Sequence, residues 1–399
     1  MSQDNTNNQD SIVIVGMART PMGGFMGELS GLKTTELGSA AIKAAVERSG
    51  LNVEDIDEVI MGCVLPAALG QAPARQASLG AGLPLSTGCT TINKVCGSGM
   101  KTVMLANDLL KAGTNNIMVA GGMESMSNAP HMLPNARAGY RFGHVKALDH
   151  MAFDGLEDAY EGGAMGNFAE LCADKYQFTR EQQDEFAITS LTRAQEAINS
   201  GAFKEEVVPV VVKSRKGETT IENDEQPLKA RLDKIPTLRP AFKKDGTVTA
   251  ANASSISDGA AAVVLMKQSE AEKRGLKPIA KIISHTTHAR KPEEFTIAPV
   301  TAIKDLLEKV QWSTDDVDLY EINEAFAVVT LAAIKDLNLD HAKVNVHGGA
   351  CALGHPIGAS GTRIIVTLLA ALKKYGKSKG VASLCIGGGE ATAIAVEML

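Results

Sequence analysis

A cysteine at the start of a glycine-rich turn is the first residue of this chain whose surroundings suit covalent chemistry. Cys96 lies in the segment 95–99, between an apolar run typical of a strand and a pattern typical of a helix. A thiol at the N-terminus of a helix meets free backbone N–H groups and the positive end of the helix dipole, which lower its pKa toward the reactive thiolate. A small core residue is the alternative interpretation, because free cysteine is among the most buried residue types.

A histidine in a run of small residues is the second candidate. His355 lies in the segment 348–361, which is dense in Gly and Ala and precedes a helical pattern. Such a run is costly in conformational entropy and is best explained by close approach of backbone and ligand. Imidazole is the usual base for a nucleophilic thiol, and Pro356 would hold the backbone still. The alternative is a loop histidine with satisfied hydrogen bonds and no catalytic role.

Two further segments offer a second thiol, backbone donors and an amide. Cys385 follows an apolar strand pattern and precedes three glycines that begin at Gly387. This thiol could move a proton, and the glycine N–H groups could form an oxyanion hole. Asn323 lies at the end of another strand pattern, where its amide could orient a water molecule toward developing negative charge. A core cysteine and a helix-capping asparagine are the alternatives.

The elements around these residues alternate between strand and helix. A strand pattern at 58–61 precedes a helical pattern that runs from Gly99 to near Gly113, and a strand pattern at 117–120 follows. This alternation predicts an α/β fold with mostly parallel sheets. We also expect the strand near Ile117 to be an edge strand that could pair across subunits.

The second part of the chain repeats the order of the first. The acidic turn and strand pattern at 54–60 return at 315–320, and the helix and strand at 98–122 return at 360–388. The chain therefore resembles two related α/β halves, which would meet along a seam where strand ends and helix starts converge.

The pattern breaks between about Ser125 and Ser255. This stretch contains a predicted helix from about Arg180 to Ser200, with Thr179 and Gln182 as its capping box. An excursion of this length is usually a lid or a ligand-binding insertion, and a solvated insertion without a ligand is the alternative.

Composition narrows the function classes. The chain has 399 residues, 44% of them hydrophobic and 22% charged, which is the balance of a globular protein with two or three domains. The net charge is −6, and we find no basic run that would follow the phosphates of a nucleic acid. No apolar stretch approaches the roughly 18 residues of a membrane helix, so we expect no membrane partner.

The N-terminus and the cysteines bear on location and metals. The polar first ten residues differ from a signal or transit peptide, and we interpret them as a disordered tail. The six cysteines have no paired metal-type spacing, so we expect free thiols, a cytoplasmic location and no metal site.

Taken together, these segments resemble the thiolase family, and the similarity extends from about Ile12 to Leu399. The motifs that carry the resemblance are 93–99, 323–327, 354–361 with 385–389, and 252–254 running into 258–261. The resemblance implies a five-layered αβαβα fold of two similar halves with a loop-domain insertion. The implied boundaries are 1–125 plus 257–276 for the N-terminal half, 126–256 for the loop domain and 277–399 for the C-terminal half. It also implies a homo-oligomer, either a dimer or a tetramer.

The family's chemistry assigns a role to each candidate. Cys96 would accept the acyl group as nucleophile, His355 would activate it, and Cys385 would be the acid and base at the α-carbon of acetyl-CoA. Asn323, through a water and with His355, would form one oxyanion hole. The backbone N–H groups of Cys96 and Gly387 would form the other. Fixed dipoles can stabilise both oxyanions, so the resemblance implies no metal and no cofactor besides coenzyme A as substrate and product.

The insertion would hold coenzyme A. The residues implied for its pantetheine arm are Ser254, Ala253, Met165, Leu238, Phe242 and Phe326. Pro227 stands where some members carry an Arg over the adenine, so Lys229 or Arg231 would substitute. Ala164 stands where short-chain biosynthetic members carry His, which leaves preference for acetoacetyl-CoA open.

The resemblance implies the reversible condensation of two acetyl-CoA molecules to acetoacetyl-CoA and coenzyme A. A thiolase for longer 3-ketoacyl-CoA chains in fatty-acid β-oxidation is the nearest alternative. A ketoacyl synthase would carry a second histidine where Cys385 stands, which disfavours it. An alternative from another functional class is a catalytically silent acyl-CoA-binding protein with the same fold.

Overall fold

The computed structural model describes residues 10–215 and 217–399. Of the tail predicted at 1–10, all but Asp10 lies outside the described residues. The carboxylate of Asp10 accepts a hydrogen bond from the backbone N–H of Ser269 at 3.1 Å.

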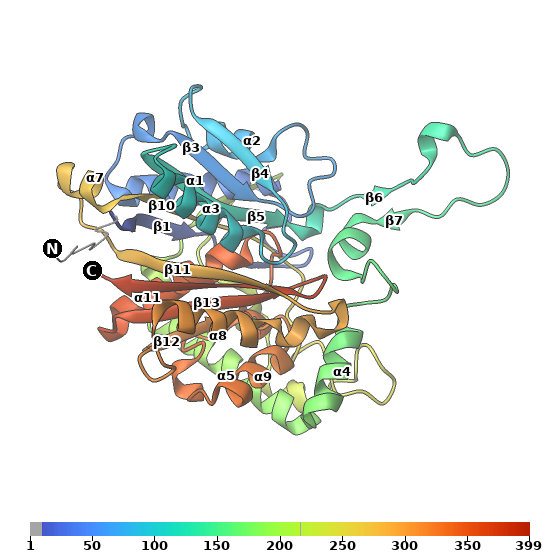
Figure 1. Ribbon diagram of the computed structural model, residues 1–399. Helices are drawn as coiled ribbons and strands as arrows, with labels where there is room; N and C mark the ends of the chain where they lie inside the picture. The colour runs from blue at the N-terminus through green and yellow to red at the C-terminus, as the bar shows by residue number, and fades with distance from the viewer. Residues whose placement is uncertain (1–9, 216) are drawn as a thin grey trace.

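The strands form two stacked halves of one continuous ten-stranded sheet (Figure 1). The first half has the order β4 (Gly88–Ile92), β3 (Glu58–Gly62), β5 (Ile117–Ser125), β10 (Ser257–Lys267) and β1 (Ile12–Arg19), with β2 (Gly23–Gly24) beside β10. The second has the order β11 (Ala280–Ala289), β14 (Glu390–Met398), β13 (Lys379–Ile386) and β12 (Leu319–Ile322). A short antiparallel pairing of β1 with β11 joins them.

Helices cover both outer faces and fill the space between the halves. The outer helices are α1 (Thr34–Ser49), α2 (Pro73–Gly80), α8 (Ala298–Val310) and α9 (Ala327–Leu337), and the middle ones are α3 (Ser98–Ala112) and α11 (Ser360–Tyr375). Every residue of α11 from Ser360 to Leu372 is buried, because this helix is apolar on nearly all sides and lies between two sheets. Each fully buried Leu or Ile there contributes about 1.5–3 kcal/mol. The predicted five layers are confirmed.

The predicted repeat is also present in the topology. In the first half β3 pairs in parallel with β5, and β5 then pairs antiparallel with β10. In the second half β12 pairs in parallel with β13, and β13 pairs antiparallel with β14. Because α3 and α11 occupy equivalent places, their N-termini approach each other at the seam.

Two expectations about the sheet are wrong. The pairings β3–β4, β3–β5 and β12–β13 are parallel, but the other pairings of the described main sheet are antiparallel. The cause is local in the second half, where a three-residue turn at 387–389 folds β14 back on β13. The strand near Ile117, β5, lies between β10 and β3, so the edge strand is β4.

The insertion between β5 and β10 packs on both halves. Its elements are β6 (His131–Met132), β7 (Leu148–Asp149), α4 (Gly166–Tyr176), α5 (Arg180–Asn199), β8 (Val210–Ser214), β9 (Gly217–Ile221) and α6 (Glu225–Lys229). Its helices α4 and α5 contact the second half, and its strands β8 and β9 pack on the core of the first. The predicted capping box of α5 is present, since the Thr179 side chain accepts from Gln182 N. The strands β6 and β7 lead into an arm that projects from the body (Figure 1). The domain boundaries themselves stay a prediction.

A buried ion-pair network ties the insertion to the first half. Arg19 on β1 contacts the Glu206 carboxylate at 2.6 Å and Asp224 at 2.7 and 2.9 Å, and all three side chains are buried. A buried guanidinium is tolerated when its donors are paired in this way.

The remaining short α-helices are α7 (Gln268–Lys273) and α10 (Ala350–Leu353).

In the described part of the chain, no helix is both long and apolar enough to cross a membrane. Nor do three or more His, Cys, Asp or Glu side chains gather as metal ligands among these residues. All six cysteines are free thiols.

Candidate active site

Cys96 is presented by a tight turn immediately before α3. The Asn93 side chain accepts from Val95 N at 2.8 Å, and the Ser98 hydroxyl donates to Val95 O at 2.7 Å. Val95 has φ of 45°, a left-handed conformation that is strained for a β-branched residue and costs on the order of 1–3 kcal/mol. This strained turn holds the Cys96 thiol at the start of the helix.

The pKa of the Cys96 thiol is raised, contrary to the expectation of a lowered pKa. Burial raises its pKa to about 11, although the backbone N–H groups of Gly387 and of Cys96 itself lower it. The backbone N–H groups therefore act in the expected direction, but desolvation by burial outweighs them. Attack by this sulfur needs a base that removes its proton.

The second thiol comes from the end of β13. Cys385 is fully buried, and its pKa is raised by that burial and by the neighbouring Cys96. Gly97 packs so closely on Ile386 that a Cβ there would lie 2.4 Å from the Ile386 Cδ1. The turn of the first half and the hairpin of the second are thus in contact, and the two sulfurs share one site.

His355 is a neutral imidazole whose tautomer follows from its hydrogen bonds. Its Nδ1 lies 2.5 Å from the Ser360 hydroxyl, and that hydroxyl donates to Pro356 O at 3.0 Å. When the Ser360 hydroxyl donates to Pro356 O, Nδ1–H is the donor to Ser360, and Nε2 is left as the basic nitrogen. Burial, together with the charge of Arg363, lowers the pKa of His355 to about 3.

The His355 loop reaches the nucleophile through its apolar neighbour. Ile357 packs with Val64 and Leu65 in a buried cluster that also contacts Cys96. The backbone N–H of His355 donates to Ser255 O at 3.1 Å, which fixes the start of the loop. The base and the thiol are therefore held on adjoining segments.

Asn323 supplies an amide that makes no hydrogen bond with the described protein. Its side chain is buried, and both its nitrogen and its oxygen lack a partner. Its backbone N–H donates to Ser383 O at 3.0 Å, two residues from Cys385. A buried amide without a protein partner costs about 1–3 kcal/mol, a cost typical of a side chain that holds water or substrate.

The neighbouring Glu324 fixes this segment rather than facing substrate. It accepts from the Ser190 hydroxyl at 2.7 Å, from the Asn345 amide at 2.8 Å and from Cys351 N at 3.0 Å. These bonds link β12 to the insertion and to α10.

Five of the predicted coenzyme A residues meet beside Asn323. Ala253 forms a bridge with Phe326, and Ser254 N donates to Ala325 O at 2.9 Å. The Phe242 ring meets the Phe326 ring edge-on at 6.0 Å, and Met165 packs against the same cluster. This group forms an apolar wall with a serine at its edge.

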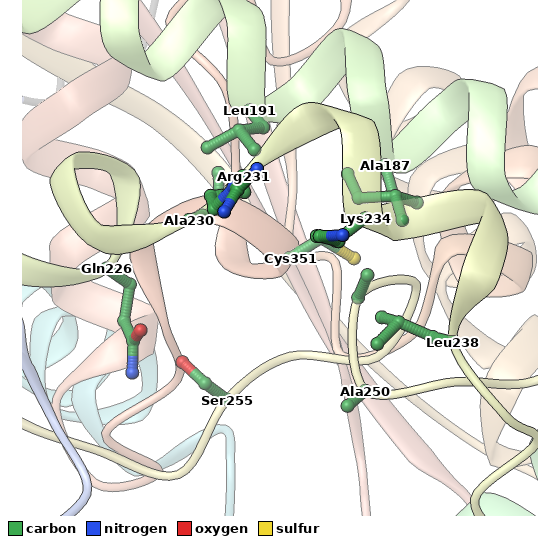
Figure 2. Close-up of a pocket in the computed structure, with 13 residues that line it drawn as sticks. Ala187, Leu191, Gln226, Ala230, Arg231, Lys234, Leu238, Ala250, Ser255 and Cys351 are labelled. Carbon is green, nitrogen blue, oxygen red and sulfur yellow. The ribbon is translucent and has the colours of Figure 1, made fainter.

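A cavity of about 250 Å³ opens between the insertion and the second half. Figure 2 shows its centre, with Gln226 and Ser255 on one side and Leu238 and Ala250 on the other. Its lining residues are Ala187, Leu191, Gln226, Ala230, Arg231, Lys234, Ile235, Leu238, Ala250, Ala251, Ser255, Cys351 and Ala352.

Of the two cations proposed for the adenine, Arg231 lines this cavity and Lys229 does not. The Lys229 ammonium contacts the carboxylates of Glu225 at 2.5 Å and Glu28 at 3.3 Å. Sequence reasoning missed Lys234, whose only signal is its place in a charged, weakly periodic stretch.

A second cavity, of about 480 Å³, lies beside the hairpin and was also missed. It is bounded by Val95, Met165 and Gly387 and by carboxylates of the segment 154–158. The acidic run at 154–161 was its only signal in the sequence.

Comparison with known proteins points to one family. The family model for the thiolase N-terminal domain matches residues 12–269, and that for the thiolase C-terminal domain matches residues 276–398. Acetyl-CoA acetyltransferase 2 of Arabidopsis thaliana is 52% identical over 395 residues, which are 98% of each chain.

Comparison with solved structures points to the same family. The acetyl-CoA acetyltransferase from Syntrophomonas wolfei superposes with a TM-score of 0.95 at 41% identity, covering 98% of this chain and all of the other. The Acat5 thiolase from Ascaris suum in complex with coenzyme A gives 0.92 at 46% identity, with the same coverage.

Proposed function

This chain belongs to the thiolase family, and from that premise we propose that it is an acetyl-CoA C-acetyltransferase. It condenses two acetyl-CoA molecules to acetoacetyl-CoA and coenzyme A, and it catalyses the reverse thiolysis. The observation that carries the proposal is the meeting of two thiols, one from each half, with a buried imidazole on a loop that adjoins the Cys96 segment.

The first step is transfer of the acetyl group to Cys96. The sulfur attacks the thioester carbonyl while His355 Nε2 takes its proton, and the carbonyl oxygen becomes an oxyanion. The N–H groups of Cys96 and Gly387 stabilise that oxyanion, since both already face the Cys96 sulfur. Collapse breaks the carbon–sulfur bond, and the proton on His355 passes to the departing coenzyme A.

The second step forms the carbon–carbon bond. Cys385 passes its proton to His355, which later returns a proton to the Cys96 sulfur, and the Cys385 thiolate so formed removes a proton from the methyl carbon of a second acetyl-CoA. The enolate then attacks the acetyl group on Cys96. His355 and a water held by the Asn323 amide stabilise the enolate oxygen. The Cys96 sulfur leaves and is reprotonated, which releases acetoacetyl-CoA. The reaction uses no metal and no further cofactor, because backbone and side-chain dipoles stabilise both oxyanions.

Coenzyme A enters through the cavity of Figure 2. Its pantetheine arm lies along Ser254, Ala253, Met165, Leu238, Phe242 and Phe326, and Arg231 faces its adenine or phosphate groups. The presence of coenzyme A in the Ascaris suum thiolase supports this part of the proposal.

A longer 3-ketoacyl-CoA is the competing substrate, and the 480 Å³ cavity beside Gly387 favours it. Ala164 leaves more room near that cavity than the His of short-chain biosynthetic members would. Thiolysis rates for 3-ketoacyl-CoA of four to sixteen carbons decide between the two. We expect the four-carbon substrate to be fastest, and a rate that rises steadily with chain length would reject acetoacetyl-CoA.

Catalytic silence is tested by mass spectrometry of the folded protein after mixing with acetyl-CoA. We expect one acetyl group on the peptide that contains Cys96. The absence of any adduct on folded protein would favour a silent acyl-CoA-binding role.

Assembly and location extend the proposal. We propose a homo-oligomer, a dimer or a tetramer, that serves lipid metabolism in the cytoplasm; the six free cysteines support a reducing compartment. The arm between β6 and β7 exposes Leu133, Tyr140, Phe142 and Val145, a patch suited to a partner subunit. Light scattering coupled to size exclusion measures the mass, and Phe142→Glu is expected to reduce it; a wild-type monomer would contradict the proposal.

A further inference from the structure

One buried carboxylate beside the nucleophile has no part in the reaction described above. Glu124 lies near the end of β5 and is fully buried. Its Oε2 accepts from Val64 N at 2.9 Å and from Gly358 N at 3.0 Å, and its Oε1 accepts from Leu65 N at 3.1 Å. A carboxylate that accepts hydrogen bonds from three backbone N–H groups holds the two distant segments firmly together, because hydrogen bonds to a charged group are strong.

The two segments that Glu124 joins carry the surroundings of the thiol and the base. Val64 and Leu65 belong to the apolar cluster that contacts Cys96. Gly358 follows His355 by three residues, and it packs so tightly that a Cβ there would lie 2.5 Å from Glu124 Oε2. Glu124 therefore links the wall around the nucleophile to the loop of the base.

We propose that Glu124 is a positioning residue: by joining the wall around Cys96 to the His355 loop, it holds the base against the nucleophile. The role of His355 in this statement rests on the proposed function, whereas the contacts of Glu124 do not.

The electrostatics of Glu124 offer a readout of this joint at the Cys96 thiol. Burial raises the pKa of Glu124 to about 7, against the lowering effect of the three N–H donors, and Glu124 in turn raises the pKa of Cys96. The titratable groups that face this carboxyl are the thiols of Cys63 and Cys96, while the His355 loop presents only the Gly358 N–H. A change of charge at Glu124 is therefore expected to change the pKa of the Cys96 thiol.

The test separates geometry from charge. Glu124→Gln keeps the shape, removes the charge and places an amide donor against at least one backbone N–H. We expect kcat to fall by about 10²-fold through misplacement of the base loop, with KM for acetyl-CoA changed less than about twofold. We also expect the pH midpoint for alkylation of Cys96 by iodoacetamide to move to lower pH, because an opposing charge is lost.

Glu170→Gln is the matched control. Glu170 is also a buried carboxylate on backbone donors, accepting from Thr247 N at 3.0 Å and Val248 N at 2.9 Å, but it lies in the insertion. We expect a comparable loss of stability and no change in the alkylation midpoint. An equal shift in this control would overturn the assignment to Glu124.

Glu124→Asp covers the case in which Glu124→Gln does not fold. The shorter side chain keeps the charge and loses contacts, so we expect kcat to fall while the midpoint stays at the wild-type pH. A downward shift with Asp would show that lost contacts, and not lost charge, move the midpoint, and wild-type kcat in either variant would overturn the positioning role. Alkylation needs no acetyl transfer, so the Glu124 result remains readable even if the wild-type protein forms no acetyl adduct.

Discussion

The seam between the two halves and the coenzyme A cavity hold their residues in opposite ways. At the seam, Cys385 and Asn323 are 0% and 1% exposed, and every segment that carries a reacting group is fixed by backbone hydrogen bonds. At the cavity, the Arg231 and Lys234 side chains are 67% and 58% exposed and pair with Asp233 at the surface. Because each seam residue is buried, we expect its replacement to have a large effect. Exposed charges are screened by solvent and salt, so we expect the replacement of any one of them to have a small effect.

We expect the largest effects from replacing the two thiols of the seam, Cys96 and Cys385. Cys96→Ala removes the acyl acceptor, so we expect no acetyl adduct and at least about a 10³-fold loss of both condensation and thiolysis. Cys385→Ala removes only the proton carrier, so the adduct should still form while condensation falls by a similar factor. Mass spectrometry measures the acetyl adduct, and rate assays measure condensation and thiolysis. If Cys385→Ala blocked the adduct, the division of roles between the thiols would be wrong.

The close packing of the seam predicts the next effect. A Cβ at Gly122 would lie 2.0 Å from Gly358 O, and backbone on both sides leaves no room to relax. We expect Gly122→Ala to destabilise the protein by about 3 kcal/mol, measured as a lower denaturation midpoint. Gly88→Ala on the edge strand β4 is the control, because its Cβ would meet Glu58 at 3.6 Å, an ordinary contact. Equal midpoints for the two variants would contradict a tightly packed seam.

The tautomer of His355 gives a third expected effect. Ser360→Ala removes the acceptor of Nδ1–H, so we expect the Nε2–H form to appear in the nitrogen NMR spectrum and kcat to fall about tenfold or more. A wild-type tautomer and kcat in this variant would show that Ser360 does not orient the ring.

The same spectrum tests the protonation of His355. Its folded pKa of about 3 lies below the unfolded value near 6.5, so the ring should stay neutral from pH 8 to pH 5. The unfolded state binds the extra proton between these values, and the stability that this residue contributes is lost as pH falls from about 6.5 toward 3. Titration near pH 6.5 in the folded protein would contradict its burial.

The same contrast explains what could be predicted from the sequence. The seam residues lie in short motifs whose glycines, thiols and imidazole are local signals, so Cys96, His355 and Cys385 could be identified before the fold was known. The raised pKa of Cys96 could not, because it depends on burial in the folded protein, which a local motif does not show. The antiparallel pairing of β5 with β10 was missed because the insertion separates the two strands.

At the cavity the sequence carried less information. Lys229 and Arg231 are two residues apart, and nothing local distinguishes them. Their difference is one of position: Lys229 pairs with Glu225 on α6 and with Glu28 from the first half, whereas Arg231 pairs with Asp233 and lines the cavity. Lys234 was missed for the same reason, since exposed cations in a charged stretch look alike.

The smallest expected effect tests that distinction directly. Arg231→Ala removes an exposed cation from the cavity, so we expect KM for coenzyme A in thiolysis to rise by no more than about fivefold, with kcat unchanged. Lys229→Ala is the matched control and should change KM less than about twofold, because Lys229 does not line the cavity, although both cations pair with carboxylates. The Arg231 effect should shrink as ionic strength rises, since an exposed cation acts on a phosphate through screened charge. If Lys229→Ala raised KM more than Arg231→Ala, coenzyme A would enter over α6 rather than through the cavity, and the pairing of Lys229 would have to break on binding.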